Sequence, residues 1–94
     1  MPALPMQEVE TRLQDMKDWK LQNEQITRTF EAASFHRAIG FVTQIAILAD
    51  KADHHPDIDI RYSTVVIALA THSEGGITEK DFSLAKQIDE AFAQ

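Results

Sequence analysis

The most regular hydrophobic pattern in the chain lies in its middle, between residues 35 and 49. There, apolar residues recur at intervals of three and four positions, at Phe35, Ala38, Ile39, Val42, Ile45, Ala46 and Ala49. This spacing places them on one side of an α-helix and predicts a long amphipathic helix. Ser34 stands just before the pattern, where a serine hydroxyl commonly caps the first turn. We expect this helix to end near Asp50 to Asp53.

Two further helices are predicted near the two ends of the chain. In residues 6–16, charged positions separate apolar ones at helical spacing, namely Met6, Val9, Leu13 and Met16. Thr78 is placed to cap a last helix, whose apolar positions include Phe82, Ala85, Ile88 and Phe92. We interpret Asp89 and Glu90 as part of the solvated face of this helix.

Two segments alternate instead between apolar and polar residues, which is typical of β-strands with one buried face. The first runs from Trp19 to Phe30 and is interrupted by Asn23-Glu24, which can form a turn. The second alternates at Ile58, Ile60 and Tyr62 and continues as the β-branched run Val65 to Thr71, with a turn expected near Ser63-Thr64. The predicted order α-β-β-α-β-β-α indicates an α+β fold, a four-stranded antiparallel sheet with three helices packed on one face. A chain of this length forms one domain, residues 1–94.

The long helix is predicted to carry a second apolar surface. Phe41, Ile47 and Leu48 lie off its main stripe and widen the apolar arc beyond what a helix on one side of a sheet needs. Exposed apolar area of this kind typically marks a contact between proteins. We therefore expect a subunit contact here.

Composition and charge narrow the possible functions. The chain is 44% hydrophobic and 26% charged, as a folded domain is expected to be. The formal net charge is −6 and the basic residues are scattered, which argues against direct binding of nucleic acid or of an anionic membrane. Without cysteine, thiol chemistry is excluded. No apolar run approaches the roughly 20 residues that span a bilayer, and residues 1–5 lack the features of a signal peptide, so we expect a cytoplasmic protein.

Two adjacent histidines stand where the long helix is predicted to end. The segment A-D-K-A-D-H-H-P-D, residues 49–57, places His54 and His55 between acidic residues and Pro56, and His72 falls at the end of the last predicted strand. Histidine exchanges protons near neutral pH, so the three together are a candidate proton-transfer site. The alternative is structural, because a histidine at a helix C-terminus also interacts favourably with the helix dipole.

These histidines do not match a common metal-binding pattern. The sequence has no H-E-x-x-H motif, no pair of histidines four residues apart and no cysteine, so we predict that no metal is bound. His36 lies near the start of the long helix without acidic neighbours, and we interpret it as structural or exposed.

Two other residues each allow two interpretations. Asp81 follows Thr78 by three positions, where a carboxylate either completes a capping box or supports catalysis. Trp19 belongs either to the core or to the wall of a pocket for a flat ring.

Further motifs accompany the histidine pair. Asp53-His54-His55-Pro56 is followed by Thr71-His72 after a β-branched run, and then by G-G-I-T-E-K-D-F-S-L-A at residues 75–85. The pattern also includes W-K-L at residues 19–21 and F-x-x-A-x-x-F-V at residues 35–42. In this combination the chain, from about Leu13 onward, resembles the pterin-4a-carbinolamine dehydratases.

The resemblance implies an activity and partners. The activity is a dehydratase that removes water from 4a-hydroxytetrahydropterin to give quinonoid dihydropterin, a step of tetrahydrobiopterin recycling after aromatic amino-acid hydroxylation. The resemblance also implies the fold predicted above, no metal and no bound cofactor, dimers or tetramers, and a functional link to an aromatic amino-acid hydroxylase. An alternative function is regulatory, because animal members of this family also act as dimerisation cofactors of a homeodomain transcription activator through their helical surface.

The resemblance further implies roles for single residues. His54 and His72 resemble the proton-transfer pair of the family, and His55 resembles the residue that holds and orients the pterin. Pro56 would fix the turn that presents the histidines. The other supporting residues implied are Asp50, Asp53, Trp19, Thr71 and Asp81.

Overall fold

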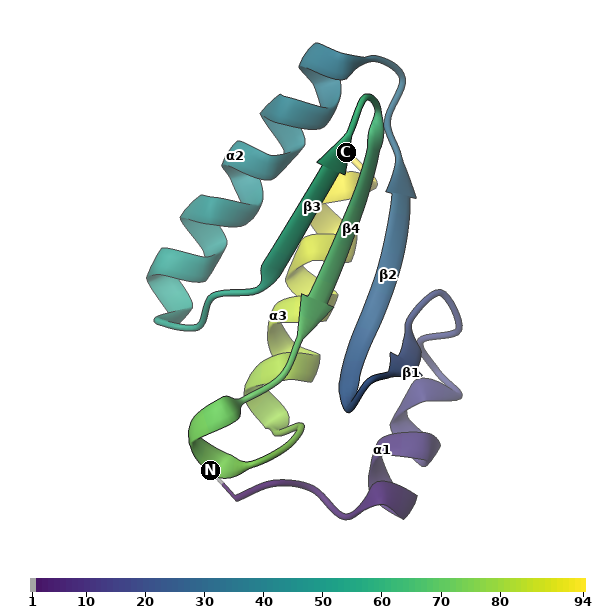
Figure 1. The fold of residues 1–94 in the computed structure, drawn as a ribbon, viewed down its shortest axis with the longest axis vertical. Coiled ribbons are helices and arrows are strands. Elements are labelled where there is room, and N and C mark those ends of the chain that lie inside the picture. The colour runs from purple at the N-terminus through teal and green to yellow at the C-terminus, as the bar shows by residue number, and fades with distance from the viewer. Residues whose placement is uncertain (1) are drawn as a thin grey trace.

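The structure, a computed structural model, describes residues 2–94 as three α-helices, four β-strands and one short 3-10 helix (Figure 1). In chain order the elements are α1 (Met6–Leu13), β1 (Lys20–Gln22), β2 (Gln25–Glu31), α2 (Phe35–Ala52), β3 (Asp57–Arg61), β4 (Thr64–Leu69), η1 (His72–Glu74) and α3 (Glu79–Phe92). The strands form one antiparallel sheet in the order β1-β2-β4-β3. The predicted α+β order is confirmed, with η1 as an unpredicted addition. The helices of the described chain fall short of what a membrane-spanning segment requires.

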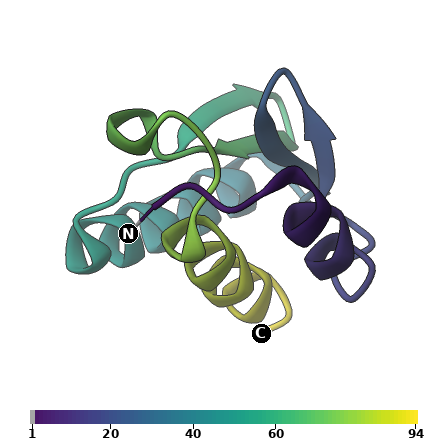
Figure 2. The ribbon, with the colours of Figure 1, turned by 90° about the horizontal axis from the view of Figure 1, so that it is seen from below.

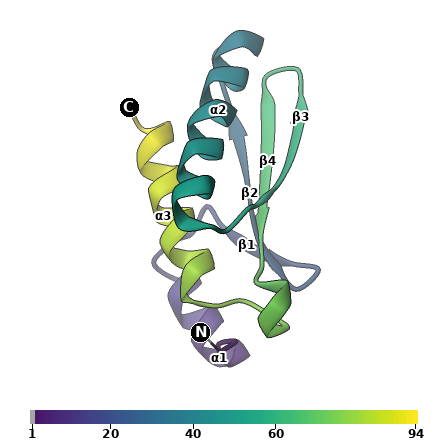
Figure 3. The same cartoon turned by 90° about the vertical axis from the view of Figure 1, so that its left-hand side faces the viewer.

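The three α-helices lie on one face of the sheet, so that the molecule has two layers (Figures 2 and 3). Strand residues that face the helices form the core. In β4 these are Val65, Ile67 and Leu69, and the strand register places Ile26 opposite Leu69 and Phe30 opposite Val65. Burying side chains of this size contributes roughly 1.5–3 kcal/mol each. The alternate residues of β4 are only partly buried and face the uncovered side of the sheet.

The buried face of helix α2 is rotated from the stripe that the sequence predicts, because Phe35 and Ile39 of that stripe are exposed. Phe41 is 7% exposed, and its ring packs against Phe30 and Phe92 with centroids 5.0 Å apart in both pairs. Leu48 is partly buried against the same core. The prediction of a second apolar surface is therefore wrong for Phe41 and Leu48, because α2 packs against α3 as well as the sheet. Ile47, the third residue of that prediction, is 53% exposed.

The two hairpins turn through residues with positive φ. Asn23 and Glu24 have φ values of 52° and 63° and form the predicted turn between β1 and β2. The second turn lies at Tyr62 and Ser63, one residue before the predicted Ser63-Thr64, and Tyr62 has a φ of 54°. Left-handed backbone of this kind is favoured by asparagine and glycine and is strained for most other residues.

A charged cluster lies between the sheet and α3. The guanidinium of Arg28 stacks on Phe30, 4.3 Å from the ring centroid, and its Nη1 donates to Asp89 Oδ1 over 2.7 Å. Asp89 also accepts a hydrogen bond from Trp19 Nε1, with 2.9 Å to Oδ1. The interpretation of Asp89 as a solvated residue is wrong, because its carboxylate is the partner of two largely buried side chains.

A second charged contact joins α1 to the first turn of α3. The guanidinium of Arg12 donates to both carboxylate oxygens of Glu79, with 2.6 Å between Nη1 and Oε2, and its Nε donates to Glu8. The hydrogen bonds from Arg12 lower the pKa of Glu79 below its ordinary value of 4.5.

We expect this contact to make stability depend on acid pH. Because the pKa of Glu79 is lower in the folded chain, the pair stabilises the fold above about pH 4.5, and that contribution is lost as the pH falls. The effect is modest because the Glu79 side chain is 42% exposed. Urea unfolding at about pH 7 and about pH 3.5 should show a larger loss of stability in wild type than in Glu79→Gln. Equal losses in the two proteins would contradict this expectation.

Candidate active site

The two adjacent histidines point in different directions because of the way in which α2 ends. Asp53 adopts a left-handed conformation, with φ 50° and ψ 44°, and its N–H donates to the carbonyl of Asp50. Such a residue commonly ends a helix and turns the chain away from the helix axis. Pro56 then disfavours a helical conformation for His55. As a result His54 is buried, with 9% of its surface exposed, whereas His55 is open to solvent.

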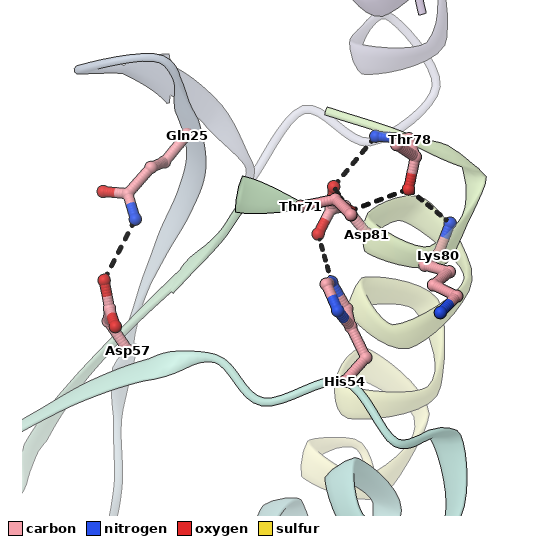
Figure 4. Close-up of polar contacts among 7 residues, drawn as sticks. All are labelled: Gln25, His54, Asp57, Thr71, Thr78, Lys80 and Asp81. Atoms are coloured by element: carbon pink, nitrogen blue, oxygen red, sulfur yellow. Dashed lines mark hydrogen bonds and ion pairs between the residues drawn. The ribbon is translucent and has the colours of Figure 1, made fainter. Parts of the chain in front are cut away.

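The imidazole of His54 contacts a fully buried carboxylate (Figure 4). Its Nε2 donates to Oδ1 of Asp81 over 2.5 Å, and Asp81 is 0% exposed in the first turn of α3. Oδ2 of Asp81 accepts from the Thr71 hydroxyl and from the backbone N–H of Thr78, both over 2.9 Å. The two threonine hydroxyls are 2.8 Å apart. Asp81 therefore completes the predicted capping box and contacts a histidine at the same time.

The contacts of Asp81 fix the chemical form of His54. An ionised carboxylate can only accept hydrogen bonds, so Nε2 of His54 carries a hydrogen. Nδ1 is then the ring nitrogen that can take up or release a second proton. A buried network in which each member has a partner also holds its side chains rigidly. The arrangement presents one histidine in a defined tautomer and orientation.

The other two histidines are exposed. Nε2 of His55 lies 2.9 Å from Oδ1 of Asp50 at the end of α2, and the two side chains are 62% and 79% exposed. His72 follows β4 and begins η1, which places it at the end of the last strand as the sequence predicts. Gly75, with φ 74°, ends η1 and lets the chain turn back toward α3.

Thr71 connects the two histidine segments. Its hydroxyl bonds to Asp81, which bonds to His54, and its backbone leads directly into His72. The structure thus joins His54 to the two predicted supporting residues Thr71 and Asp81. It joins His55 to a different carboxylate. Within residues 2–94, acidic and histidine side chains do not gather in a group of three that could hold a metal ion.

Trp19 lies in the core on the helix-covered face of the sheet. It is 2% exposed, and its ring meets Phe30 edge to face with 6.1 Å between centroids. Its Nε1 donates to Asp89 near the end of α3. This position matches the core interpretation, one of the two that the sequence allowed. Asp53 is exposed, and its left-handed backbone ends α2.

Two contacts in this part of the structure were not predicted from the sequence. Thr78 was predicted as a helix cap, but its hydroxyl also bonds to Thr71. On the uncovered face of the sheet, Gln25 Nε2 donates to Asp57 Oδ2 over 3.0 Å. Because β4 separates the strands of Gln25 and Asp57, only the strand order could have indicated this pair.

A small α+β domain with a histidine held by a buried carboxylate is equipped for proton transfer to or from a small ligand. The family model described as pterin 4 alpha carbinolamine dehydratase matches residues 2–91. A Chloroflexus aurantiacus protein provisionally named a pterin-4-alpha-carbinolamine dehydratase is 56% identical over 90 residues, covering 96% of this chain and 97% of that protein. A Sulfolobus acidocaldarius protein with the same provisional name is 45% identical, covering 87% and 90%. The chain belongs to the pterin-4a-carbinolamine dehydratase family, as its motifs predict.

Two solved structures share the fold. A Brucella melitensis protein described as a transcriptional coactivator/pterin dehydratase has a TM-score of 0.90 and 37% identity, covering 95% of this chain and 97% of its own. A pterin dehydratase-like protein described as a RuBisCO assembly factor in the alpha-carboxysome has a TM-score of 0.70 and 21% identity, covering 82% and 92%. The second likeness concerns the fold alone.

Proposed function

We propose that this protein removes water from 4a-hydroxytetrahydropterin to give quinonoid dihydropterin. The observation that carries the proposal is the bond between His54 and the fully buried carboxylate of Asp81 in a member of this family. A histidine held in one tautomer and orientation is suited to act as a general acid or base. In this role the protein acts in tetrahydrobiopterin recycling, downstream of an aromatic amino-acid hydroxylase.

The reaction needs an acid and a base at adjacent atoms of one ring. The C4a–O bond breaks with its electron pair on oxygen, and an acid protonates that oxygen so that water leaves. The lone pair of N5 forms the new N5=C4a double bond, and a base takes the N5 proton. Only protons move between protein and substrate, so the proposal requires neither a metal nor a redox cofactor. Each positioned acid or base typically contributes about 10²–10⁴ in rate.

We assign the proton transfers to His54 and His72 and the orientation of the pterin to His55. Asp81 holds the Nε2 hydrogen of His54, so Nδ1 is the atom that exchanges a proton with the substrate. Asp50 steadies His55 through the contact of 2.9 Å. Asp53 and Pro56 shape the loop that carries the two histidines. Thr71 and Thr78 complete the hydrogen-bond network around Asp81.

The decay of freshly generated 4a-hydroxytetrahydropterin, followed by ultraviolet absorbance, tests this function. We expect wild type to accelerate the decay, and His55→Ala to reduce the acceleration by roughly 10² because the ring is no longer oriented. His36→Ala is the matched control, since His36 is an exposed histidine at the other end of α2 that bonds to Ser34. A wild-type rate equal to the spontaneous rate would overturn the proposal.

A second role, assembly or interaction through α2, is supported by its exposed apolar residues. Phe35 and Ile39, one turn apart, are 52% and 40% exposed, and Ile47 is 53% exposed. We propose that the chain forms a homodimer or homotetramer through this helix, because covering these side chains removes apolar surface from water. Light scattering should give a multiple of the mass of one chain, and Ile39→Glu should lower it, whereas Gln44→Glu on another side of α2 should not. If wild type has the mass of a single chain, self-association through α2 is wrong. Interaction with a different protein is then the remaining role of this surface.

A further inference from the structure

The uncovered face of the sheet carries an amide–carboxylate pair beside the candidate active site. Gln25 is the first residue of β2 and Asp57 the first residue of β3, and β4 runs between them. Their side chains reach across β4 toward one another, with 3.0 Å between Gln25 Nε2 and Asp57 Oδ2 (Figure 4). The register places Asp57 opposite Ala68 of β4, whose side chain is a single methyl group. The pair therefore spans a low part of the sheet surface.

The bond fixes which atoms the pair presents to a ligand. A carboxylate accepts and does not donate, so the amide nitrogen of Gln25 faces Asp57 and its carbonyl oxygen is directed away. The bond uses one carboxylate oxygen of Asp57 and one hydrogen of the amide. Gln25 Oε1 and Asp57 Oδ1 are the atoms left to accept hydrogen bonds from a ligand. The pair is thus a binding group for two neighbouring donors.

Of the two residues, Gln25 lies beside one of the histidines. Gln25 and His72 line the same hollow of about 420 Å³, together with Asn23, Glu24, Ala70, Gly75 and Gly76. This volume is in the range of small-molecule sites. The small residues among its lining leave room for a flat ring. Asp57 is also close in sequence to the histidine pair, since it follows His55 and Pro56 directly.

We propose that Gln25 and Asp57 determine specificity by binding the 2-amino-4-oxopyrimidine edge of the pterin. That edge carries two adjacent donors, the N3–H and the 2-amino group, which match the two acceptor oxygens of the pair. The histidines then meet the other ring, where C4a and N5 react. This inference rests on the proposed function for the identity of the ligand, but it concerns recognition of the ring edge and not proton transfer.

The test compares two stable ring analogues, 6-methylpterin and 6-methyllumazine, by fluorescence titration. The lumazine carries an oxygen in place of the 2-amino group, so it offers an acceptor where the pair needs a donor. We expect wild type to bind the pterin about tenfold more tightly, because a mismatched polar edge leaves groups unpaired. Asp57→Asn should weaken pterin binding about tenfold and bring the ratio of the two affinities toward one, because its amide can turn a donor toward the lumazine oxygen. Gln25→Ala should reduce the ratio in the same direction.

Asp59→Asn is the matched control. Asp59 lies two residues along β3 on the same face of the sheet, and its carboxylate bonds to Arg61 Nε over 3.1 Å. This variant should keep the wild-type ratio. Three results would overturn the inference. Wild type could bind the two analogues equally tightly, wild type could bind neither of them, or Asp57→Asn could keep the wild-type ratio of affinities.

Turnover separates this inference from the proposed function. In the decay assay, Asp57→Asn should raise KM about tenfold with little change in kcat, since the ring edge is bound equally before and during the reaction. Catalysis by wild type without discrimination between the analogues overturns the inference and leaves the proposed function standing. Discrimination that depends on Asp57, without catalysis by wild type, overturns the proposed function and supports recognition of the ring edge.

Discussion

Replacing Asp81 with asparagine is expected to slow the dehydration of 4a-hydroxytetrahydropterin by about 10²–10⁴. The amide has the shape of the carboxylate, but its oxygen is needed by the Thr78 N–H and the Thr71 hydroxyl. Its NH2 group then faces His54 and donates where Asp81 accepted. His54 Nε2 must become an acceptor, which moves the hydrogen to Nδ1 and reverses the roles of the two ring nitrogens.

Two readouts distinguish this effect from a loss of folding. The rate of decay reports catalysis, and the nitrogen chemical shifts of His54 report which ring nitrogen carries the hydrogen. Glu79→Gln is the matched control, because it neutralises another carboxylate in the first turn of α3. It should leave the rate and the tautomer unchanged. An Asp81→Asn variant that keeps the wild-type rate would show that the tautomer of His54 does not matter for the reaction.

Replacing Asp89 with alanine is expected to destabilise the fold by roughly 2–3 kcal/mol without touching the histidine site. The Asp89 carboxylate accepts from Trp19 Nε1 and from Arg28, whose side chain is only 18% exposed. Without it, a buried indole N–H and a largely buried guanidinium lose their partner. Arg28 keeps a more distant contact with Asp18, 3.6 Å away, which limits the loss.

Urea unfolding followed by tryptophan fluorescence measures this change, since Trp19 is the only tryptophan in the sequence. Glu90→Ala is the control, because Glu90 is the next residue of α3 and is exposed. It should shift the free energy of unfolding by at most about 0.5 kcal/mol. If the two variants proved equally stable, the cluster around Asp89 would contribute nothing to the fold.

The order of elements could be predicted from the sequence because each element has its own local pattern. The hydrophobic period, the Ser34 cap and the turn at Asn23 and Glu24 all act over a few residues. The buried face of α2 was less predictable from the sequence, because it depends on how α3 packs beside this helix. Phe41 shows this, since its ring meets Phe92 from the far end of the chain.

The same distinction applies to the site. Local motifs marked the three histidines, and the spacing of Thr78 and Asp81 predicted the capping box that the structure contains. The spacing could not decide which histidine Asp81 contacts, because that depends on how α3 lies against the end of α2. The pair formed by Gln25 and Asp57 depends on the order of three strands, and no local pattern encodes it.

The double use of Asp81 links the proposed chemistry to the cooperativity of folding. The carboxylate that bonds to His54 also satisfies the backbone of the first turn of α3. Opening of that turn therefore also displaces the carboxylate that holds the histidine. A substitution that removes the acceptor oxygens of Asp81 is therefore expected to affect the start of α3 as well as His54.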